Sequence, residues 1–539
     1  MRALLWLLAP LLAACAVTSR GMVVAPEPLA ADAGAAVLRE GGNAIDAAVC
    51  IGFVLAVTHP EAGNLGGGGF LLVHTARSDG LVDARETAPA LATRTMYDGT
   101  GKEGSLVGPL ASGVPGSVAG YLLALERWGS MDRARLLAPA IRLAEEGFLV
   151  DAGLARSLER NAALLRRFPT AAAVFLPGGR APAAGTLLRQ PALAATLRRI
   201  AEEGVDGFYR GRVAEEIERV SAASGGILTA DDLAAYQPKV RRPLVGRYAG
   251  ATVLTTPPPS SGGIALLQIL AMLPPEEFAA LPPVQRFHRF AEAGRRAFAD
   301  RAAHLGDPDF VAVPMARLLD PIYLAQRKAS IDPARATPEI AAGGTGGSAE
   351  GESTCHFSVV DSAGNAVACT TTLNGAYGCG AMAAGFLLNN EMDDFTTAPG
   401  KPNQYGLLQG ENNAIAPGKR PLSSMTPTIL LRDGRPVLVT GSPGGPTIIS
   451  TVALIVLQIS ALGMDGRAAV GAPRIHHQWM PDEILHEPLP GALRAALAAL
   501  GHTMRAKEGP MGDAQVVTRT PAGELEGASD PRGRGKAAW

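Results

Sequence analysis

The sequence predicts an α+β fold in which helices cover β-sheets. Amphipathic helical segments dominate residues 115 to about 330, whereas strand-turn-strand patterns begin after residue 353 and alternate with further helical stretches. Apolar residues make up 47% of the 539 residues, close to the ~45 to 50% of soluble proteins. The chain can therefore bury a large core, and its composition excludes a disordered chain, a coiled coil and a collagen.

The N-terminus resembles an export signal. One Arg precedes an apolar run from Ala3 to Ala14, which is shorter than the ~20 residues that span a bilayer. Residues 12–15 resemble a bacterial lipobox, in which the final Cys receives a lipid; an ordinary signal peptide with an incidental Cys is the alternative. We expect removal of residues 1–14 and export to the periplasm or cell surface, with Cys15 as a lipid anchor and the only membrane contact.

Two buried helices are expected over residues 29–58. Residues 29–58 hold two Ala-rich apolar segments separated by Gly41 and Gly42, and the run Gly63–Gly69 then leads into the strand-like FLLVH. A phosphate loop is a weaker alternative for this run, because no Lys-Ser/Thr follows and the run precedes a strand. We expect its glycines to permit tight backbone packing.

The next region predicts amphipathic helices with solvated, charge-rich faces. The clearest segments are GSVAGYLLALERWG, ARLLAPAIRLAEEGF and VQRFHRFAEAGRRAFAD. Residues 340–353, IAAGGTGGSAEGES, lack apolar periodicity and predict a flexible exposed linker. HFSVV, the turn SAGN and AVACTTT then predict a hairpin, and two more hairpins are expected in TILLRDGRPVLVTGS and AQVVTRTPAGELEG, beside helical stretches at residues 449–462 and 490–500.

Charge and metal-binding patterns narrow the function. With Lys+Arg 49, Asp+Glu 50 and a net charge of -1, no nucleic-acid partner is expected, which leaves a small molecule. His476 and His477 are adjacent and point apart, so a metal pair there is not expected. No metal or organic cofactor is predicted. The mature chain's other cysteines lack metal-site spacing and are interpreted as packing residues: Cys50, Cys355, Cys369 and Cys379.

A hydroxyl residue stands where the linker meets the strand. The Thr354 hydroxyl could attack the carbonyl of Ser353, giving an ester that water hydrolyses, so that a new chain begins at Thr354. Its free α-amine, with a pKa of roughly 7.7 to 8.0, could then accept the hydroxyl proton. A Gly-rich loop before a strand is, however, more often only a loop.

Motifs along the chain favour self-cleavage at Thr354 over an ordinary loop. STCHFSVVDSAGNAVACTTTLN, GFLLNNEMDDF, KRPLSSMTPT and VTGSPGG resemble small-subunit motifs of the γ-glutamyltranspeptidase family, the glutathione hydrolases, and GMVVA, GGNAIDAAV, GNLGGGGF and DARETAPA resemble its large-subunit motifs. The match runs in order from about Gly21 to Pro531. It implies a four-layer αββα sandwich of the N-terminal nucleophile hydrolase type, cut between Ser353 and Thr354 into a large subunit (residues 15–353) and a small subunit (residues 354–539) that form a heterodimer and one structural unit.

The resemblance also implies a division of labour around the substrate. Thr354 is the nucleophile of processing and catalysis, Thr372 holds its oxygen, and the backbone N–H groups of Gly444 and Gly445 form the oxyanion hole. The remaining positions are implied to bind the substrate. Its α-carboxylate is bound by Arg85, Ser423 and Ser424, and its α-ammonium by Asn374, Glu391 and Asp394. Tyr405, on a lid from about Thr396 to Arg420, covers the bound glutamyl group. Turn formation is the alternative role for the two serines, and Asp393 is expected to solvate its loop.

The implied activity is γ-glutamyl transfer from glutathione and related compounds, through a Thr354 ester, to water or to amino acid and dipeptide acceptors. Two departures from the family are Cys355, where a second Thr is frequent, and a shortened stretch between Asn374 and Leu387. A glutaryl or cephalosporin acylase of the same superfamily is the close alternative, although Asp394 and Tyr405 favour a substrate with an α-ammonium. The second alternative is a non-catalytic lipoprotein that binds amino acids.

Overall fold

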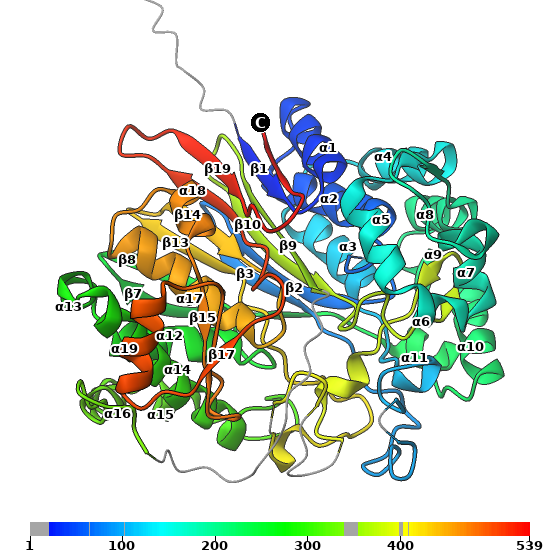
Figure 1. Ribbon diagram of the computed structural model, residues 1–539. Coiled ribbons are helices and arrows are strands. Elements are labelled where there is room, and N and C mark those ends of the chain that lie inside the picture. Colours follow the sequence, from blue (N-terminus) through cyan, green and yellow to red (C-terminus); the bar gives the residue numbers. More distant parts are fainter. Residues whose placement is uncertain (1–20, 64, 102, 339–353, 398–402, 408) are drawn as a thin grey trace, which may run out of the picture.

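The fold rests on two β-sheets packed face to face. The computed structural model describes residues 21–63, 65–101, 103–338, 354–397, 403–407 and 409–539. The expected signal peptide, Cys15, the linker of residues 340–353 and Ser353 lie outside the described residues. Thin grey traces mark these parts in Figure 1.

The first sheet brings together strands from both ends of the chain. Its order is β20 (Lys536–Ala538), β1 (Met22–Ala25), β9 (Thr354–Val360), β10 (Ala366–Thr372), β2 (Gly68–His74), β3 (Asp79–Ala84) and β6 (Lys239–Arg241). The second sheet runs β19 (Leu525–Ser529), β18 (Gln515–Arg519), β14 (Arg435–Gly441), β13 (Thr428–Arg432), β8 (Ala251–Thr255) and β7 (Leu244–Tyr248). Residues before and after the predicted cut therefore share both sheets.

Strand β2 shows how the layers form. Phe70 and Leu72 pack in the core shared with the second sheet, whereas Leu71 and Val73 pack in the core under the N-terminal helices. Successive side chains of a strand point to opposite faces, so a continuous apolar run such as FLLV belongs to a sheet that is covered on both sides. The strand predicted for FLLVH is confirmed.

One helical layer covers the outer face of the first sheet (Figure 1). Its central helix α2 is apolar all round, all fifteen of its residues are buried, and a capping box of Asn43 and Asp46 fixes its start. The helices on this side are α1 (Pro28–Arg39), α2 (Ala44–Thr58), α3 (Ser117–Trp128), α4 (Arg133–Glu146), α5 (Ala152–Arg160), α6 (Ala162–Arg166), α7 (Pro169–Phe175), α8 (Pro191–Glu203), α9 (Asp206–Tyr209), α10 (Gly211–Ala223) and α11 (Ala230–Ala235). The expected pair of helices separated by Gly41 and Gly42 is confirmed.

The other helical layer lies against the second sheet (Figure 1). It consists of α12 (Gly262–Met272), α13 (Pro275–Ala280), α14 (Pro283–His304), α15 (Met315–Leu318), α16 (Pro321–Ala329), α17 (Thr447–Ser460), α18 (Gly466–Gly471) and α19 (Gly491–Ala499). Short strand pairings complete the fold: β4 (Phe148–Leu149) with β5 (Leu187–Leu188), β11 (Met382–Ala383) with β12 (Phe386–Leu387), and β16 (Ile484–His486) between β15 (Ile475–His476) and β17 (Met504–Ala506). Helix, sheet, sheet and helix form the expected four layers.

Helices dominate the middle of the chain as expected, but residues 239–255 hold three strands that the sequence did not predict. Strand β6 pairs with β3 and strand β8 with β13, both from distant segments, and β7 forms a hairpin with β8. The charges of α14 are also not a solvated face: Arg295, Arg296 and Arg301 are almost fully buried. Glu292, one turn away, forms ion pairs with the first two at 2.7 Å, which offsets the cost of burying them.

Candidate active site

Thr354 lies opposite Thr372 in the β9-β10 hairpin. The antiparallel register pairs Val360 with Ala366 at the turn and reaches Thr354 and Thr372 at the open end. Their hydroxyl oxygens are 3.1 Å apart, and the Thr372 oxygen also accepts the Asn374 backbone N–H at 2.8 Å. Both residues are buried. The hairpin thus presents one hydroxyl supported by another.

The glycine run brings backbone close to this hairpin end. A Cβ on Gly67 would lie 1.9 Å from the Thr372 carbonyl oxygen, and one on Gly69 would lie 2.3 Å from that of Thr370. No side chain fits there, so only glycine permits this approach. Tight backbone packing, expected from the sequence, is confirmed for this run.

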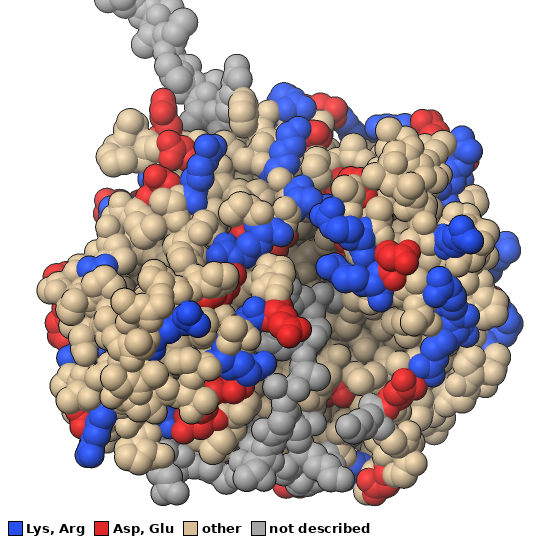
Figure 2. Space-filling model, viewed as in Figure 1, with Lys and Arg blue, Asp and Glu red and all other residues tan. Residues whose placement is uncertain are grey.

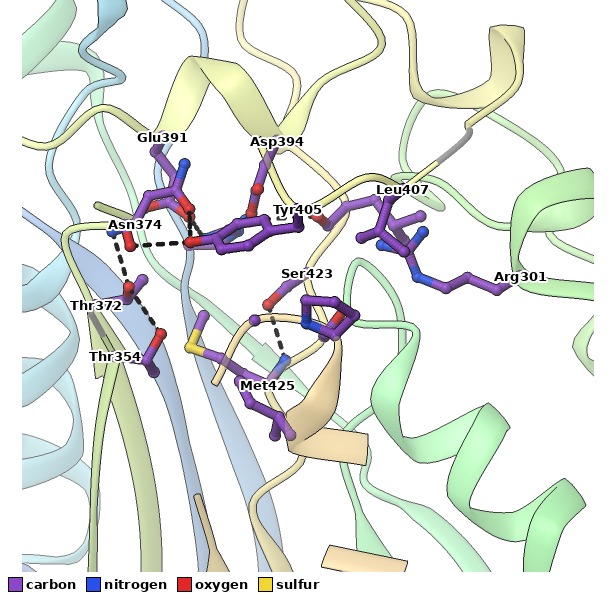
Figure 3. A pocket seen from close by; sticks show the side chains of 16 residues that line it. Arg301, Thr354, Thr372, Asn374, Glu391, Asp394, Tyr405, Leu407, Ser423 and Met425 are labelled. Carbon is purple, nitrogen blue, oxygen red and sulfur yellow. Dashed lines mark hydrogen bonds and ion pairs between the residues drawn. The ribbon is translucent and has the colours of Figure 1, made fainter. Parts of the chain in front are cut away.

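A cavity opens beside the Thr354 hydroxyl (Figure 3), and the empty space in and at the mouth of this cavity, open solvent included, is about 330 Å³. Residues from the β3 end, α14, the β9-β10 hairpin and the loops around residues 391–425 and 445 line it. They are Arg85, Arg301, Thr354, Thr372, Asn374, Glu391, Asp394, Tyr405, Leu407, Leu422, Ser423, Ser424, Met425, Gly445, Pro446 and Ile448. The structure therefore gathers the expected catalytic and substrate-binding residues around one cavity, except Gly444, which adjoins Gly445; Ser353 and Cys15 lie outside the described residues.

Arg85 forms ion pairs with the carboxylates expected to bind an ammonium. Its guanidinium donates to Glu391 and to Asp394, the latter at 2.5 Å, and its Nε donates to the Pro421 carbonyl at 3.1 Å. Burial alone would lower the pKa of Arg85, but these carboxylates raise it, so the side chain stays a cation. The two halves of the expected zwitterion site thus neutralise each other in this structure.

Three carboxyl groups, those of Glu86, Glu391 and Asp394, lie within ion-pair distance of Arg85. Glu86 is also fully buried beside it, and burial raises the pKa of Glu86 to about 7. Burial likewise raises the pKa of Glu391 well above its usual range, despite the opposing effect of Arg85. Glu391 Oε2 is buried with no hydrogen-bond partner among the described residues. Such an oxygen is costly to leave unpaired and is available to a donor such as an ammonium.

Tyr405 lies across the pocket (Figure 3). Its hydroxyl donates to Asn374, with the side-chain oxygen at 2.6 Å, and its ring contacts the region of Gly445. The short turn that carries it is closed by Asn403 Oδ1, which accepts the backbone N–H of Tyr405 at 3.0 Å. Leu407 lines the same cavity. These contacts close the cavity on the side expected for a lid.

The Gly444–Gly445 pair lies directly before α17. Both have positive φ, 129° and 53°, which favour glycine. Neither backbone N–H has a hydrogen-bond partner in the part of the chain that the structure describes. Unpaired N–H groups at the start of a helix favour an anion, so the pair can stabilise a developing oxyanion if it reaches the reacting carbonyl.

The Ser423–Ser424 turn meets the same cavity. Ser423 Oγ accepts the Met425 backbone N–H at 3.1 Å, which is the turn role considered as the alternative. An accepting hydroxyl still has a proton to donate. A carboxylate could therefore bind there without breaking the turn.

Asp393 does not solvate its loop. It is buried, and its carboxylate accepts Ser105 Oγ at 2.7 Å and the Gln404 backbone N–H at 3.0 Å. Burial raises its pKa to about 6. The residue ties the segment before Tyr405 to the rest of the protein, which corrects the expectation.

Sequence reasoning missed Arg301. It reaches the cavity from α14 (Figure 3), it is 2% exposed, and burial lowers its pKa to about 10. Its Nε donates to Ser261 Oγ at 3.0 Å, while Nη1 is buried without a partner among the described residues. The only available signal was an Arg in an amphipathic segment, which is typical of a solvated surface.

The adjacent histidines and the cysteines are buried in the protein interior. Within the described ranges, no group of three or more His, Cys, Asp or Glu side chains is placed to hold a metal ion. His476 Nδ1 lies 2.7 Å from Ser450 Oγ, and His477 Nε2 lies 3.2 Å from Asp482. All four cysteines after residue 20 are free. No helix of the described chain is long and apolar enough to cross a membrane.

Known proteins show the same combination of fold and motifs. The model of the family described as gamma-glutamyltranspeptidase matches residues 30–539. The chain belongs to the γ-glutamyltranspeptidase family. It is 46% identical over 529 residues to the glutathione hydrolase proenzyme of Escherichia coli K12, covering 95% of this chain and 90% of that protein.

Solved structures related to this γ-glutamyltranspeptidase family member include two kinds of enzyme. Cephalosporin acylase from Bacillus halodurans aligns with a TM-score of 0.86 at 29% identity, covering 97% of this chain and 96% of that one. The γ-glutamyltranspeptidase of Helicobacter pylori aligns with a TM-score of 0.57 at 42% identity, covering 58% of this chain and 92% of that one. The fold expected from the resemblance is confirmed.

Proposed function

We infer that this chain is a γ-glutamyltransferase and glutathione hydrolase. The observation that carries this inference is the Thr354 hydroxyl, supported by Thr372, beside a buried cavity lined by both cations and carboxylates. A γ-glutamyl group has an α-carboxylate, an α-ammonium and a reacting carbonyl. Paired charges at one end of a cavity and a hydroxyl at the other suit that arrangement.

The chain is a precursor that cuts itself between Ser353 and Thr354. Attack by Thr354 Oγ1 on the Ser353 carbonyl breaks the Ser353–Thr354 amide, which gives an ester and frees the α-amine of Thr354. Hydrolysis of the ester then releases the Ser353 carboxylate and restores the Thr354 hydroxyl. That amine then takes the hydroxyl proton when Thr354 attacks a substrate. Residues 15–353 and 354–539 become the two subunits, which stay together as a heterodimer.

Catalysis proceeds through a γ-glutamyl ester on Thr354. The Gly444 and Gly445 N–H groups stabilise the oxyanion, and Thr372 positions the nucleophile. The substrate carboxylate displaces part of the pairing around Arg85 and binds Arg85, Ser423 and Ser424. The ammonium binds Asn374, Glu391 and Asp394 beneath Tyr405, and the unpaired Glu391 Oε2 supports this assignment.

The ester is resolved by water in hydrolysis and by an amino acid or dipeptide amine in transfer. The protein is exported to the periplasm or cell surface and is tethered there by a lipid on Cys15. Radiolabelled palmitate incorporation that is lost in Cys15→Ser would support the lipid anchor, and unchanged incorporation would contradict it.

Denaturing gels with N-terminal sequencing test the precursor and the activity together. The purified wild-type protein should give two polypeptides, the smaller starting at Thr354, and should release the aniline from a γ-glutamyl anilide. Thr354→Ala should remain one full-length chain without activity, whereas Thr371→Ser, a conservative change at the neighbouring strand position, should still be cut. A stable uncut wild-type chain would contradict the mechanism.

A glutaryl or cephalosporin acylase is the second candidate, favoured by the TM-score of 0.86 to the acylase from Bacillus halodurans. A glutaryl group has no ammonium, so it would leave Glu391 and Asp394 without a ligand charge to balance. We therefore expect the γ-glutamyl anilide to be preferred over the glutaryl anilide in parallel assays. The reverse preference would favour the acylase.

A further inference from the structure

Thr354 lines a second, larger cavity on its other side. This cleft, of about 1730 Å³, contacts the loop at His59, helix α5, the segment at residues 507–513 and the C-terminal segment at residues 532–534. The first cavity holds about 330 Å³ and is covered by Tyr405. If the γ-glutamyl group occupies the small cavity, as the proposed function requires, the departing and incoming amines must use the open cleft.

One face of α5 forms a wall of this cleft. Arg156 and Ser157 lie three and four residues after Gly153, and Arg160 lies seven after it, so all four share the helix face that lines the cleft. Leu154 and Leu158 anchor the opposite face in the core, and the Asp151 side chain caps the helix by accepting the Leu154 N–H at 2.8 Å. The two arginines are thus exposed side chains on a fixed backbone.

The other arginines of the cleft are already neutralised. Arg534 pairs with Asp151 and with Glu61, and Arg532 pairs with Glu487 at 2.6 Å and with Asp530 at 3.0 Å. Arg156 and Arg160 differ, because neither forms an ion pair or hydrogen bond with any residue that the structure describes. Both arginines therefore lack an anionic partner among the described residues.

The carboxylates of the cleft do not cancel this charge. Glu61 is held by Arg534 at 3.3 Å. Burial and the nearby Asp530 raise the pKa of Asp513 to about 8, so that group is largely protonated at neutral pH. Glu508 is exposed, lines the same cleft beside Lys507 and forms no ion pair with Arg156 or Arg160 in the part of the chain that the structure describes. Figure 2 shows Lys and Arg side chains flanking a hollow near the middle of this face.

We propose that Arg156 and Arg160 bind the terminal carboxylate of a short peptide whose amine leaves, or attacks, the γ-glutamyl group at Thr354. A guanidinium pair one helical turn apart suits a carboxylate, with charge-assisted hydrogen bonds. The inference rests on the proposed function, since it assigns the leaving-group and acceptor side of that same reaction. It gives the enzyme a preference for peptides with a free C-terminus.

Matched substrates with and without that carboxylate test the proposal. In one arm, a γ-glutamyl anilide is the donor and glycylglycine is compared with glycylglycinamide as acceptor. In the other arm, hydrolysis of glutathione is compared with hydrolysis of its C-terminal amide. The variants are Arg156→Gln/Arg160→Gln, the charge-retaining Arg156→Lys/Arg160→Lys, and the control Arg219→Gln, an exposed arginine on α10 outside the cleft.

The wild type and Arg219→Gln should prefer the free acid over the amide about tenfold in kcat/KM, since exposed charge-assisted contacts are modest. The double Gln variant should lose the preference in at least one arm, and the double Lys variant should retain part of it. Loss in the first arm alone assigns the site to the incoming peptide, and loss in the second alone to the departing one.

Two results would overturn the proposal: no preference in the wild type, or an undiminished preference in the double Gln variant. Failure of the proposed function looks different. In that case the wild type releases no aniline from the γ-glutamyl anilide, and the role of Arg156 and Arg160 is contradicted together with the proposed function.

Discussion

Gly445 meets two constraints at one residue. Its φ of 53° is unfavourable for any side chain, and a Cβ there would lie 2.8 Å from the Tyr405 ring. Gly463 also has a positive φ, 66°, but a Cβ added to it would have no atom within 4 Å. Comparing Ala substitutions at Gly445 and Gly463 therefore separates the effect of backbone strain from the effect of displacing Tyr405.

We expect Gly445→Ala to lower kcat/KM for a γ-glutamyl anilide at least tenfold, because the new methyl group moves Tyr405 off the pocket. Gly463→Ala should keep activity while losing a similar ~1 kcal/mol of stability from strain. Initial rates and melting temperatures measure the two effects. Equal activity losses in both variants would argue against a contact between Gly445 and the lid.

Arg301 adds a second buried cation to the pocket. With Nη1 unpaired, its most direct use is a further hydrogen bond to the α-carboxylate of the substrate. Arg301→Gln should raise KM for a γ-glutamyl anilide roughly tenfold or more, as for a lost charge-assisted bond. KM for 4-aminobutyryl anilide, which lacks that carboxylate, should change little.

Arg301→Lys is the matched control, since it keeps the charge. The role assigned to Arg301 would be contradicted if KM for both anilides rose equally in Arg301→Gln. That pattern would indicate that the arginine only supports the fold through Ser261.

At the scale of elements, α14 is stabilised by a buried charge network. Burial opposes ionisation of Glu292, but hydrogen bonds from Thr337, Arg296 and Arg295 lower its pKa to about 2. A carboxylate with a lowered pKa stabilises the fold above its unfolded pKa of roughly 4.3, and this stabilisation is lost as the pH falls toward 2.

We expect Glu292→Gln to lower stability by about 3 to 5 kcal/mol at pH 7, because it leaves buried arginines uncompensated. Thermal or urea unfolding at pH 7 and pH 3 measures the change, and the difference from wild type should shrink at pH 3. Glu216→Gln, which breaks the exposed Arg219 pair, should cost less than about 1 kcal/mol. A pH-independent difference for Glu292→Gln would contradict the ionised network.

The β9-β10 hairpin shows what the sequence can predict about a site. Two strands joined by a short turn have a single register once the turn is placed, and that register extends from Val360 and Ala366 to Thr354 and Thr372. Strand β8 could not be found in this way. Its partner β13 comes from a segment more than 170 residues away, as in the contact between the Thr255 and Thr428 hydroxyls, so no local pattern reveals it. Arg301 was missed for a similar reason, because burial by distant segments turned a surface-like residue into a pocket residue.

In the whole molecule, the segments before and after Thr354, which are proposed to become two subunits, are interleaved. Strand β1 pairs with β9 and with β20, and β10 pairs with β2, so the first sheet alternates between segments on either side of residue 354. In the second sheet, β8 pairs with β13. Cutting one peptide bond would leave these hydrogen bonds and both cores intact.

We therefore expect the cut protein to remain one particle without any disulfide, since its cysteines after residue 20 are free. Size-exclusion chromatography under reducing conditions should give a single peak that contains both polypeptides, and a denaturing gel should separate them. Dissociation into separate large and small subunits in native buffer would contradict a shared fold.

Thr354 is proposed to become the first residue of a chain and to carry the γ-glutamyl group during turnover. Mass spectrometry of protein quenched in acid during turnover of a γ-glutamyl anilide tests it directly. We expect a peptide that begins at Thr354 and carries the added mass of one glutamyl group on that residue. A glutamyl group on another residue, or a Thr354 that is still joined to Ser353 in fully active protein, would contradict it.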